Sequence, residues 1–190
     1  METEHGHSRK LLVCFYEFLG QIFFMYAVMV AGGSLSEYAG IVGPLALFAV
    51  VNIFGGVSGG HFNPAVTLGV YIREKKVSNC PFMLAIMGSQ VAGALVGMFL
   101  AYFVLRNNEN GEFIVPPQSV PLLLPSTITR ESIDNNTFVL NESFVTVYMS
   151  VICTFIFVFF ILHVTGKHTG APDLGVWGVP AICLVLWGLI

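Results

Sequence analysis

A short glycine-rich run contains the residues of this sequence that are best suited to form hydrogen bonds with small polar molecules. The run consists of Gly59, Gly60, His61, Phe62, Asn63, Pro64 and Ala65. A helix is expected to start at Pro64, because proline is favoured at the first helical position, where its missing N–H costs nothing. Asn63 then takes the N-cap position, where its side-chain oxygen accepts a hydrogen bond from a free backbone N–H group. Its NH₂ group is left to donate a hydrogen bond to a ligand.

Composition places this run in a membrane protein. The chain has 190 residues, 55% hydrophobic and 10% charged, with a net charge of −3 and a mean hydropathy of +0.79. Soluble domains carry about 25% charged residues. High hydrophobicity with little charge excludes a disordered chain. Eight Lys and Arg residues spread over the whole chain exclude a basic nucleic-acid binder.

Apolar runs divide the chain into helical spans. A transmembrane helix needs about 20 residues. The expected spans are residues 11–31, 38–56, 81–105, 143–164 and 174–190. A polar N-terminal segment, residues 1–10, precedes them, and residues 106–142 form a polar, proline-bearing loop. The sequence therefore predicts an all-α integral membrane protein with one transmembrane domain over residues 11–190.

Residues 57–72 are expected to form a re-entrant loop and a half-helix. The apolar stretch Ala65–Ile72 is too short to cross a bilayer. Non-helical backbone survives at membrane depth only where protein buries it or where it lines a water-filled cavity. The carbonyls of residues 59–62 are therefore expected to line a cavity. The half-helix would point its positive dipole end at the bilayer midplane, which repels cations and protons. A glycine-rich turn that caps an ordinary helix is the alternative.

Basic residues give the expected orientation. With residues 1–10 in the cytoplasm and residues 57–72 re-entrant, six of the eight Lys and Arg residues face the cytoplasm. This distribution agrees with the positive-inside rule. The loop at residues 106–142 is then extracellular.

The segment SGGHFNPAVT, between two spans and before a basic turn, resembles the first pore loop of the aquaporin family, also called the major intrinsic proteins. The resemblance covers nearly the whole chain. It implies an inverted-repeat helical bundle and a passive channel for water and small neutral solutes that excludes protons and ions. It also implies a homotetramer in the lipid bilayer of the plasma membrane or an internal vacuolar membrane, with no cofactor and no metal.

Three polar residues fit the same resemblance: Glu17 in the first span, Gln90 in the third and Glu142 at the opening of the fourth. Glu17 and Glu142 open the similar blocks EFLGQIFFMY and ESFVTVYMS, as an inverted repeat requires. In the family such glutamates brace the pore loops by accepting backbone hydrogen bonds. A proton-relay role is the alternative for Glu17, because carboxylates inside a membrane are usually functional.

The resemblance also places candidate selectivity-filter residues. One falls on Gly43, twenty residues before Asn63, where water-selective members have a bulky aromatic side chain. A second falls in the last span, at Gly188 or Ile190. A filter with glycine in its wall is expected to be wider and to pass solutes such as glycerol or urea. Alternatively, Gly43 lets its span bend or pack closely beside Pro44.

The second repeat is expected to continue past the end of this sequence. Glu17 precedes Asn63 by 46 residues, and the same offset from Glu142 leads to position 188. A second pore loop would follow Ile190, so the chain is interpreted as a fragment. The alternative to a channel is a non-conducting subunit that assembles with full-length relatives. An enzyme is not expected, because no Ser/His/Asp or metal-ligand constellation is visible.

Overall fold

The computed structural model describes residues 2–33, 39–75, 79–105, 142–166 and 178–189. No strand occurs among these residues, which form helices joined by short turns. The helices are α1 (Glu2–Gly33), α2 (Ala39–Ser58), α3 (Pro64–Arg73), α4 (Cys80–Leu105), α6 (Glu142–Val164) and α7 (Gly178–Leu189). The protein is therefore all-α, as its sequence predicts.

Several of the described helices are long and apolar enough to cross a bilayer. The candidate spans are Ser8–Gly32, Gly40–Ser58, Cys80–Leu105 and Val147–Val164, which belong to α1, α2, α4 and α6. Helix α7 has 12 residues and lies within the expected last span, of which residues 174–177 and 190 fall outside the described residues. The protein is an integral membrane protein.

Several boundaries differ from those expected. Helix α2 runs to Ser58, so residues 57–58, expected in the re-entrant loop, belong to that helix, while α3 ends and α4 begins within one residue of the expected positions. Helix α1 begins at Glu2 and so takes in most of the polar segment at residues 1–10. That segment contains no proline, and a helix can leave the bilayer without losing its internal backbone hydrogen bonds. Of the polar loop expected at residues 106–142, only Glu142 is described, as the first residue of α6.

Helices α1 and α4 touch through their backbones. A Cβ atom added at Gly93 would stand 2.4 Å from the carbonyl oxygen of Phe18, and one at Gly97 would stand 2.6 Å from that of Ile22. Only glycine permits this approach, which is the use of GxxxG patterns in membrane helices. The close contact sets the distance between the polar residues that face each other across the two helices.

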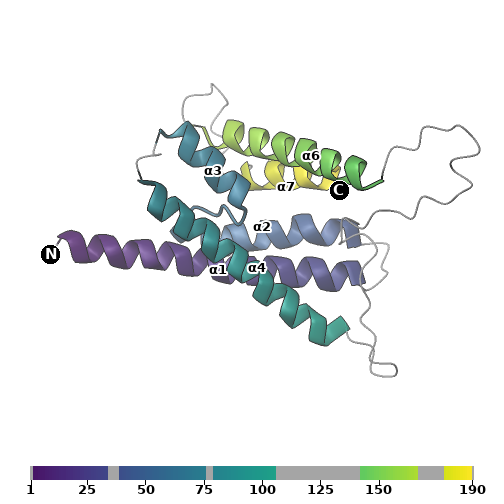
Figure 1. Cartoon of the computed structure of the whole chain (residues 1–190), viewed down its shortest axis with the longest axis horizontal. Helices are drawn as coiled ribbons and strands as arrows, with labels where there is room; N and C mark the ends of the chain where they lie inside the picture. Colours follow the sequence, from purple (N-terminus) through teal and green to yellow (C-terminus); the bar gives the residue numbers. More distant parts are fainter. Residues whose placement is uncertain (1, 34–38, 76–78, 106–141, 167–177, 190) are drawn as a thin grey trace, which may run out of the picture.

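Helix α3 has half the length of a span. Its 10 residues correspond to about 15 Å, against a hydrocarbon core of about 30 Å. Figure 1 shows that α3 begins near the middle of the bundle and runs toward the end where the N-terminus lies. It packs against α4 and α6. Its start is held in a core cluster that consists of Leu47, Val50, Phe62, Val66, Phe157, Ile161 and Cys183.

Large apolar side chains cover the outside of the bundle. Phe155 is 70% exposed, Ile53 is 66% exposed and Leu95 is 61% exposed. Such a surface would be unfavourable in water. It fits a protein whose outer faces contact lipid tails, while its few buried polar side chains gather inside.

Candidate functional site

The backbone between α2 and α3 turns sharply through left-handed conformations. Gly59 has a φ of 98° and Gly60 a φ of 68°, a region that glycine enters freely. The Gly59 N–H donates to the Gly55 carbonyl at 2.9 Å, and the Gly60 N–H donates to Ser58 Oγ at 3.1 Å. A Cβ atom at Gly60 would stand 3.2 Å from Gly55 Cα. The two glycines therefore let the chain end α2 and fold back on itself.

A buried carboxylate holds the next two backbone N–H groups. Glu17 is fully buried; its Oε1 accepts from the His61 N–H at 3.0 Å and its Oε2 from the Phe62 N–H at 2.7 Å. Gln90 Nε2 also donates to Oε2, at 2.8 Å. Each carboxylate oxygen thus has a donor, which limits the cost of burying the group. Glu17 lies outside the lining of the cavities described below.

The Phe62 side chain anchors the loop to α1. Phe62 is 2% exposed, and its φ of 41° is unusual for a residue other than glycine. Its ring lies directly on Gly20, where an added Cβ atom would stand 2.2 Å from Cε1. The absence of a side chain at Gly20 therefore makes the space for this ring. Nothing in the local sequence indicates this partnership, because 42 residues separate the two positions.

Asn63 caps α3. Its φ of −159° and ψ of 124° are extended, and its Oδ1 accepts from the Ala65 N–H at 2.8 Å. Pro64 takes the first helical position. With Oδ1 committed to the backbone, the Nδ2 group of this half-buried residue remains to donate elsewhere.

Thr67, a functional residue that was not predicted from the sequence, connects the loop to α4. Its side chain is fully buried. Its Oγ1 lies 2.9 Å from Gln90 Nε2, 3.2 Å from the Asn63 carbonyl and 3.2 Å from His61 Nδ1. A threonine hydroxyl inside a helix often donates to the backbone carbonyl four residues earlier. The four-residue spacing between Asn63 and Thr67 is the sequence feature that could have indicated this contact.

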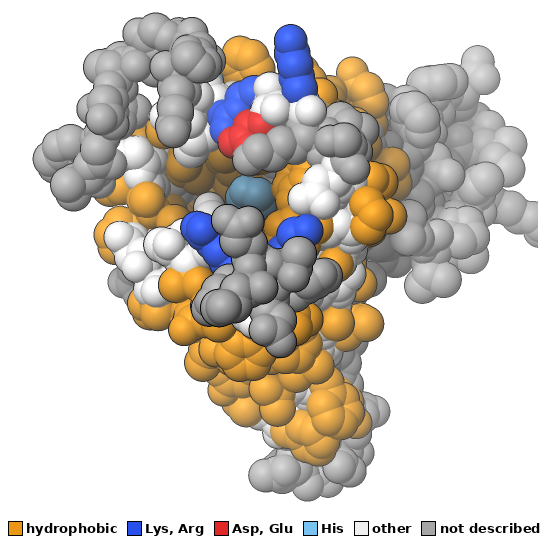
Figure 2. Space-filling view, turned by 90° about the vertical axis from the view of Figure 1, so that its left-hand side faces the viewer, with side chains coloured by type: hydrophobic (Ala, Val, Ile, Leu, Met, Phe, Trp, Pro, Cys, Tyr) orange, Lys and Arg blue, Asp and Glu red, His pale blue; other side chains and the backbone are white. Residues whose placement is uncertain are grey.

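Two cavities meet beside this loop. The first, of about 380 Å³, is lined in part by Gly59, Gly60 and His61. The second, of about 300 Å³, is lined in part by His61, Phe62 and Asn63, together with Ser150 and Thr154 of α6. Leu47, His61 and Phe157 line both cavities and so stand where they meet. Figure 2 shows a hollow at the end of the molecule where the N-terminus lies, with Lys and Arg side chains around it and a histidine inside.

The remaining predicted site residues lie away from these cavities or outside the described part. Gly43 is buried on α2 and lines neither cavity. Ala65 lines a separate groove, described next. Ile190 and the side chain of Glu142 lie outside what the structure describes, and Gly188 is placed only as part of the α7 backbone.

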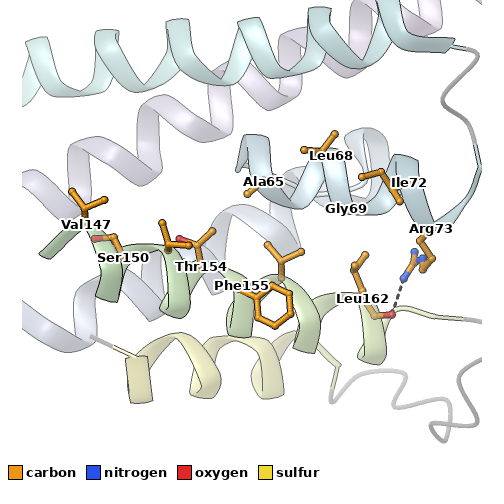
Figure 3. Close-up of a pocket in the computed structure, with 12 residues that line it drawn as sticks. Ala65, Leu68, Gly69, Ile72, Arg73, Val147, Ser150, Thr154, Phe155 and Leu162 are labelled. Atoms are coloured by element: carbon orange, nitrogen blue, oxygen red, sulfur yellow. Dashed lines mark hydrogen bonds between the residues drawn. The ribbon is translucent and has the colours of Figure 1, made fainter. Parts of the chain in front are cut away.

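An apolar groove of about 810 Å³ runs along the contact between α3 and α6 and is lined by residues of both helices (Figure 3). Arg73, at the end of α3, closes it: its Nη1 donates to the Leu162 carbonyl at 2.8 Å and to Thr165 Oγ1 at 2.9 Å. The Leu162 carbonyl belongs to the last turn of α6. Carbonyls in the last turn of a helix have no N–H partner within that helix. The groove shares Ser150 and Thr154 with the second cavity.

Fold and site together define a helical membrane protein with a half-helix capped by asparagine beside an internal cavity. Residues 5–188 match the family described as "Major intrinsic protein", and the chain belongs to that family. It is 36% identical over 99 residues to a propanediol uptake facilitator of Salmonella typhimurium, covering 47% of this chain and 36% of that protein. It is 35% identical over 105 residues to Aquaporin-8 of Notomys alexis, covering 52% and 39%.

A longer match extends over most of the chain. A glycerol uptake facilitator-like protein of Lactiplantibacillus plantarum is 28% identical over 164 residues, which cover 83% of this chain and 65% of that protein. The chain spans between a third and a half of the length of the other two relatives.

Proposed function

We propose that this chain contributes the first-loop half of a passive transmembrane pathway for water and small neutral solutes. The observation that carries the proposal is the position of Asn63. Its Oδ1 is held by the Ala65 N–H at 2.8 Å, while the residue lines an internal cavity with largely apolar neighbours. A cavity with apolar walls and a few fixed polar groups is the usual form of a small-molecule site.

The same geometry supports exclusion of cations and protons. Helix α3 begins at Pro64, next to the cavity that Asn63 lines, so the positive end of its dipole lies beside the pathway. Half-helix dipoles of this orientation raise the electrostatic barrier for cations in water pores. Glu17 and Gln90 would keep this helix start in place through their contacts with the loop.

For the solutes, we propose that the pathway passes glycerol-sized polar molecules as well as water. Gly43 offers no side chain to narrow the pathway at the filter position that the family resemblance indicates. Two of the matched relatives are named as uptake facilitators for propanediol and for glycerol. The homotetramer, and placement in the plasma membrane or an internal vacuolar membrane, belong to the same proposal.

Substitution of Asn63 tests the pathway. Asn63→Leu removes the donor and should lower the water permeability of proteoliposomes, per folded protein, by about fivefold, the equivalent of one hydrogen bond. Phe99→Leu is the matched control, because Phe99 is 61% exposed on the lipid-facing side of α4. Equal permeability for wild type and Asn63→Leu, at equal folded amounts, would remove Asn63 from the pathway.

A second substitution tests the solute range. Gly43→Phe should reduce glycerol and urea flux and leave water flux, because an aromatic ring narrows the filter without blocking single-file water. Unchanged glycerol flux in Gly43→Phe would exclude Gly43 from the filter.

One observation favours the second candidate, a non-conducting subunit that works with longer relatives. The second cavity shares Ser150 and Thr154 with the groove between α3 and α6, so the cavity adjoins an apolar groove that could take an apolar segment of another chain. Proteoliposomes with this chain alone, compared with liposomes without protein, separate the two candidates. Water flux above the protein-free rate supports the channel. No flux from this chain alone, together with a changed flux of a full-length relative when this chain is added to it, supports the subunit.

A further inference from the structure

We infer that His61 carries its single ring proton on Nδ1 and presents a bare Nε2 to the cavity as a hydrogen-bond acceptor. The imidazole would bind the O–H or N–H group of a permeating molecule. The tautomer follows from the buried contacts alone, whereas the role in permeation rests on the proposed function.

The tautomer is fixed by the single hydroxyl hydrogen of Thr67. Three atoms near Thr67 Oγ1 could accept it: the Asn63 carbonyl at 3.2 Å, His61 Nδ1 at 3.2 Å and Gln90 Oε1 at 3.3 Å. The fourth neighbour, Gln90 Nε2 at 2.9 Å, can only donate. Of the three candidate acceptors, His61 Nδ1 alone is also able to donate.

The orientation of Gln90 is settled by Glu17. A carboxylate offers only acceptors when ionised, so the Gln90 amide turns its Nε2 toward Glu17 Oε2, at 2.8 Å. The second hydrogen of Nε2 then points to Thr67 Oγ1. After this bond, the Thr67 hydroxyl can still accept one hydrogen bond and donate one.

Counting hydrogen bonds separates the two tautomers. If His61 Nδ1 donates, Thr67 Oγ1 accepts from both His61 and Gln90 and gives its own hydrogen to the Asn63 carbonyl, which makes three bonds. If Nδ1 accepts, the hydroxyl makes two bonds and its remaining lone pair faces acceptor oxygens. Thr67 is fully buried and Gln90 is 1% exposed, so water cannot replace a missing bond. In both cases the Asn63 carbonyl keeps its bond from the Thr67 N–H, at 3.0 Å. The tautomer with the proton on Nδ1 therefore makes one more hydrogen bond inside this buried network, which favours it.

The other ring nitrogen lies on the cavity side. A Cβ atom at Gly59 would stand 3.5 Å from His61 Nε2, and both residues line the first cavity. Among the described residues Nε2 has no hydrogen-bond partner, whereas Nδ1 is engaged with Thr67. His61 also lines the second cavity, where it stands with Asn63.

Asn63 and His61 therefore offer complementary groups along the two cavities. Asn63 Nδ2 donates, and His61 Nε2 accepts. A molecule with both a donor and an acceptor, such as water, a polyol or an amide, can satisfy both groups. A polar solute without O–H or N–H can satisfy only Asn63, so the arrangement favours protic neutral solutes.

Nitrogen NMR of ¹⁵N-histidine-labelled protein in bilayers tests the tautomer directly, with His61→Gln used to assign the resonance among the five histidines of the chain. We expect a protonated, pyrrole-type Nδ1 and an unprotonated, pyridine-type Nε2. Thr67→Val, which removes the acceptor, should shift the population toward the Nε2–H form, and Thr67→Ser should retain Nδ1–H. A protonated Nε2 in the neutral wild-type ring, or an unchanged tautomer in Thr67→Val, would overturn the assignment.

Flux measurements test the role in permeation separately. His61→Leu should lower water permeability by about fivefold, and unchanged permeability would overturn the acceptor role. If the wild-type chain shows no flux above the protein-free rate, the proposed function fails for this chain, while the NMR result still decides the tautomer.

Discussion

The carboxylate of Glu17 and the backbone N–H of Phe62 are joined by a 2.7 Å hydrogen bond, although 45 residues separate them in the chain. This contact ties the middle of α1 to the turn that precedes α3. It places the start of the half-helix relative to a full transmembrane helix. The position of Asn63 beside the cavity therefore depends on a residue that does not line the cavity.

Replacing that carboxylate should weaken the fold. Glu17→Gln keeps the size of the side chain but replaces one carboxylate oxygen with an NH₂ group. That group faces one of the N–H donors of His61, Phe62 or Gln90, so a buried donor loses its acceptor. The expected loss is about 1–3 kcal/mol of unfolding free energy. The midpoint of thermal unfolding in detergent measures it.

Gln21 provides a contrasting control one turn along α1. Its Oε1 is buried and has no hydrogen-bond partner within the described part of the chain, and the residue is 7% exposed. Gln21→Met removes an unsatisfied acceptor and should leave the unfolding midpoint unchanged or raise it. A large loss in Gln21→Met together with none in Glu17→Gln would contradict the assignment of these two residues.

The contact between α1 and α4 should tolerate no side chain at Gly93. In Gly93→Ala the new methyl group would stand 2.4 Å from the Phe18 carbonyl oxygen, a backbone atom that cannot move alone. Overpacking of this kind costs about 1–3 kcal/mol. Unfolding midpoints of the two proteins measure the difference.

Gly88→Ala is the matched control in the same helix. A Cβ atom there would meet no atom of the residues that the structure describes within 4 Å. Because alanine is the better helix former, this variant should gain up to about 1 kcal/mol. Equal effects of the two substitutions would show that helix propensity, rather than close packing, governs α4.

Arg73 should hold the end of α3 to the end of α6. Arg73→Leu leaves the half-buried Leu162 carbonyl without its charged donor, at a cost of about 1–3 kcal/mol, whereas water can replace the bond to the exposed Thr165. The ion pair of Arg73 with Glu74, at 3.7 Å, is partly exposed. Glu74→Gln should therefore change the unfolding free energy by less than about 1 kcal/mol. A larger loss in Glu74→Gln than in Arg73→Leu would contradict this order.

The orientation in the membrane is predicted from the basic residues. In a variant without its native cysteines, Lys75→Cys should react with a membrane-impermeant maleimide only from the cytosolic side. Val120→Cys, in the loop at residues 106–142, should react only from the opposite side. Labelling of Val120→Cys from the cytosol would reverse the predicted topology.

The sequence by itself determined the helical elements, because helix starts and membrane spans depend on residues that are close together in the chain. Low charge and long apolar runs identified the membrane class, because a bilayer requires about 20 apolar residues per helix. The pair Asn63–Pro64 predicted the start of α3, since capping and the missing proline N–H act within one turn. The resemblance to the aquaporin family also pointed to Glu17 and Gln90 as residues that brace the loop.

Tertiary structure alone decided which groups meet. The Phe62 ring lies on Gly20, Thr67 joins His61 to Gln90, and Arg73 reaches the last turn of α6. These pairings depend on how close α1 and α4 approach and on where α3 docks, which no hydrophobic period specifies. Gly43, predicted for the filter, is buried on α2 away from both described cavities, and its role stays a prediction. Spacing along the chain fixes where a helix begins, but a cavity is formed by residues from several helices, and only their packing brings those residues together.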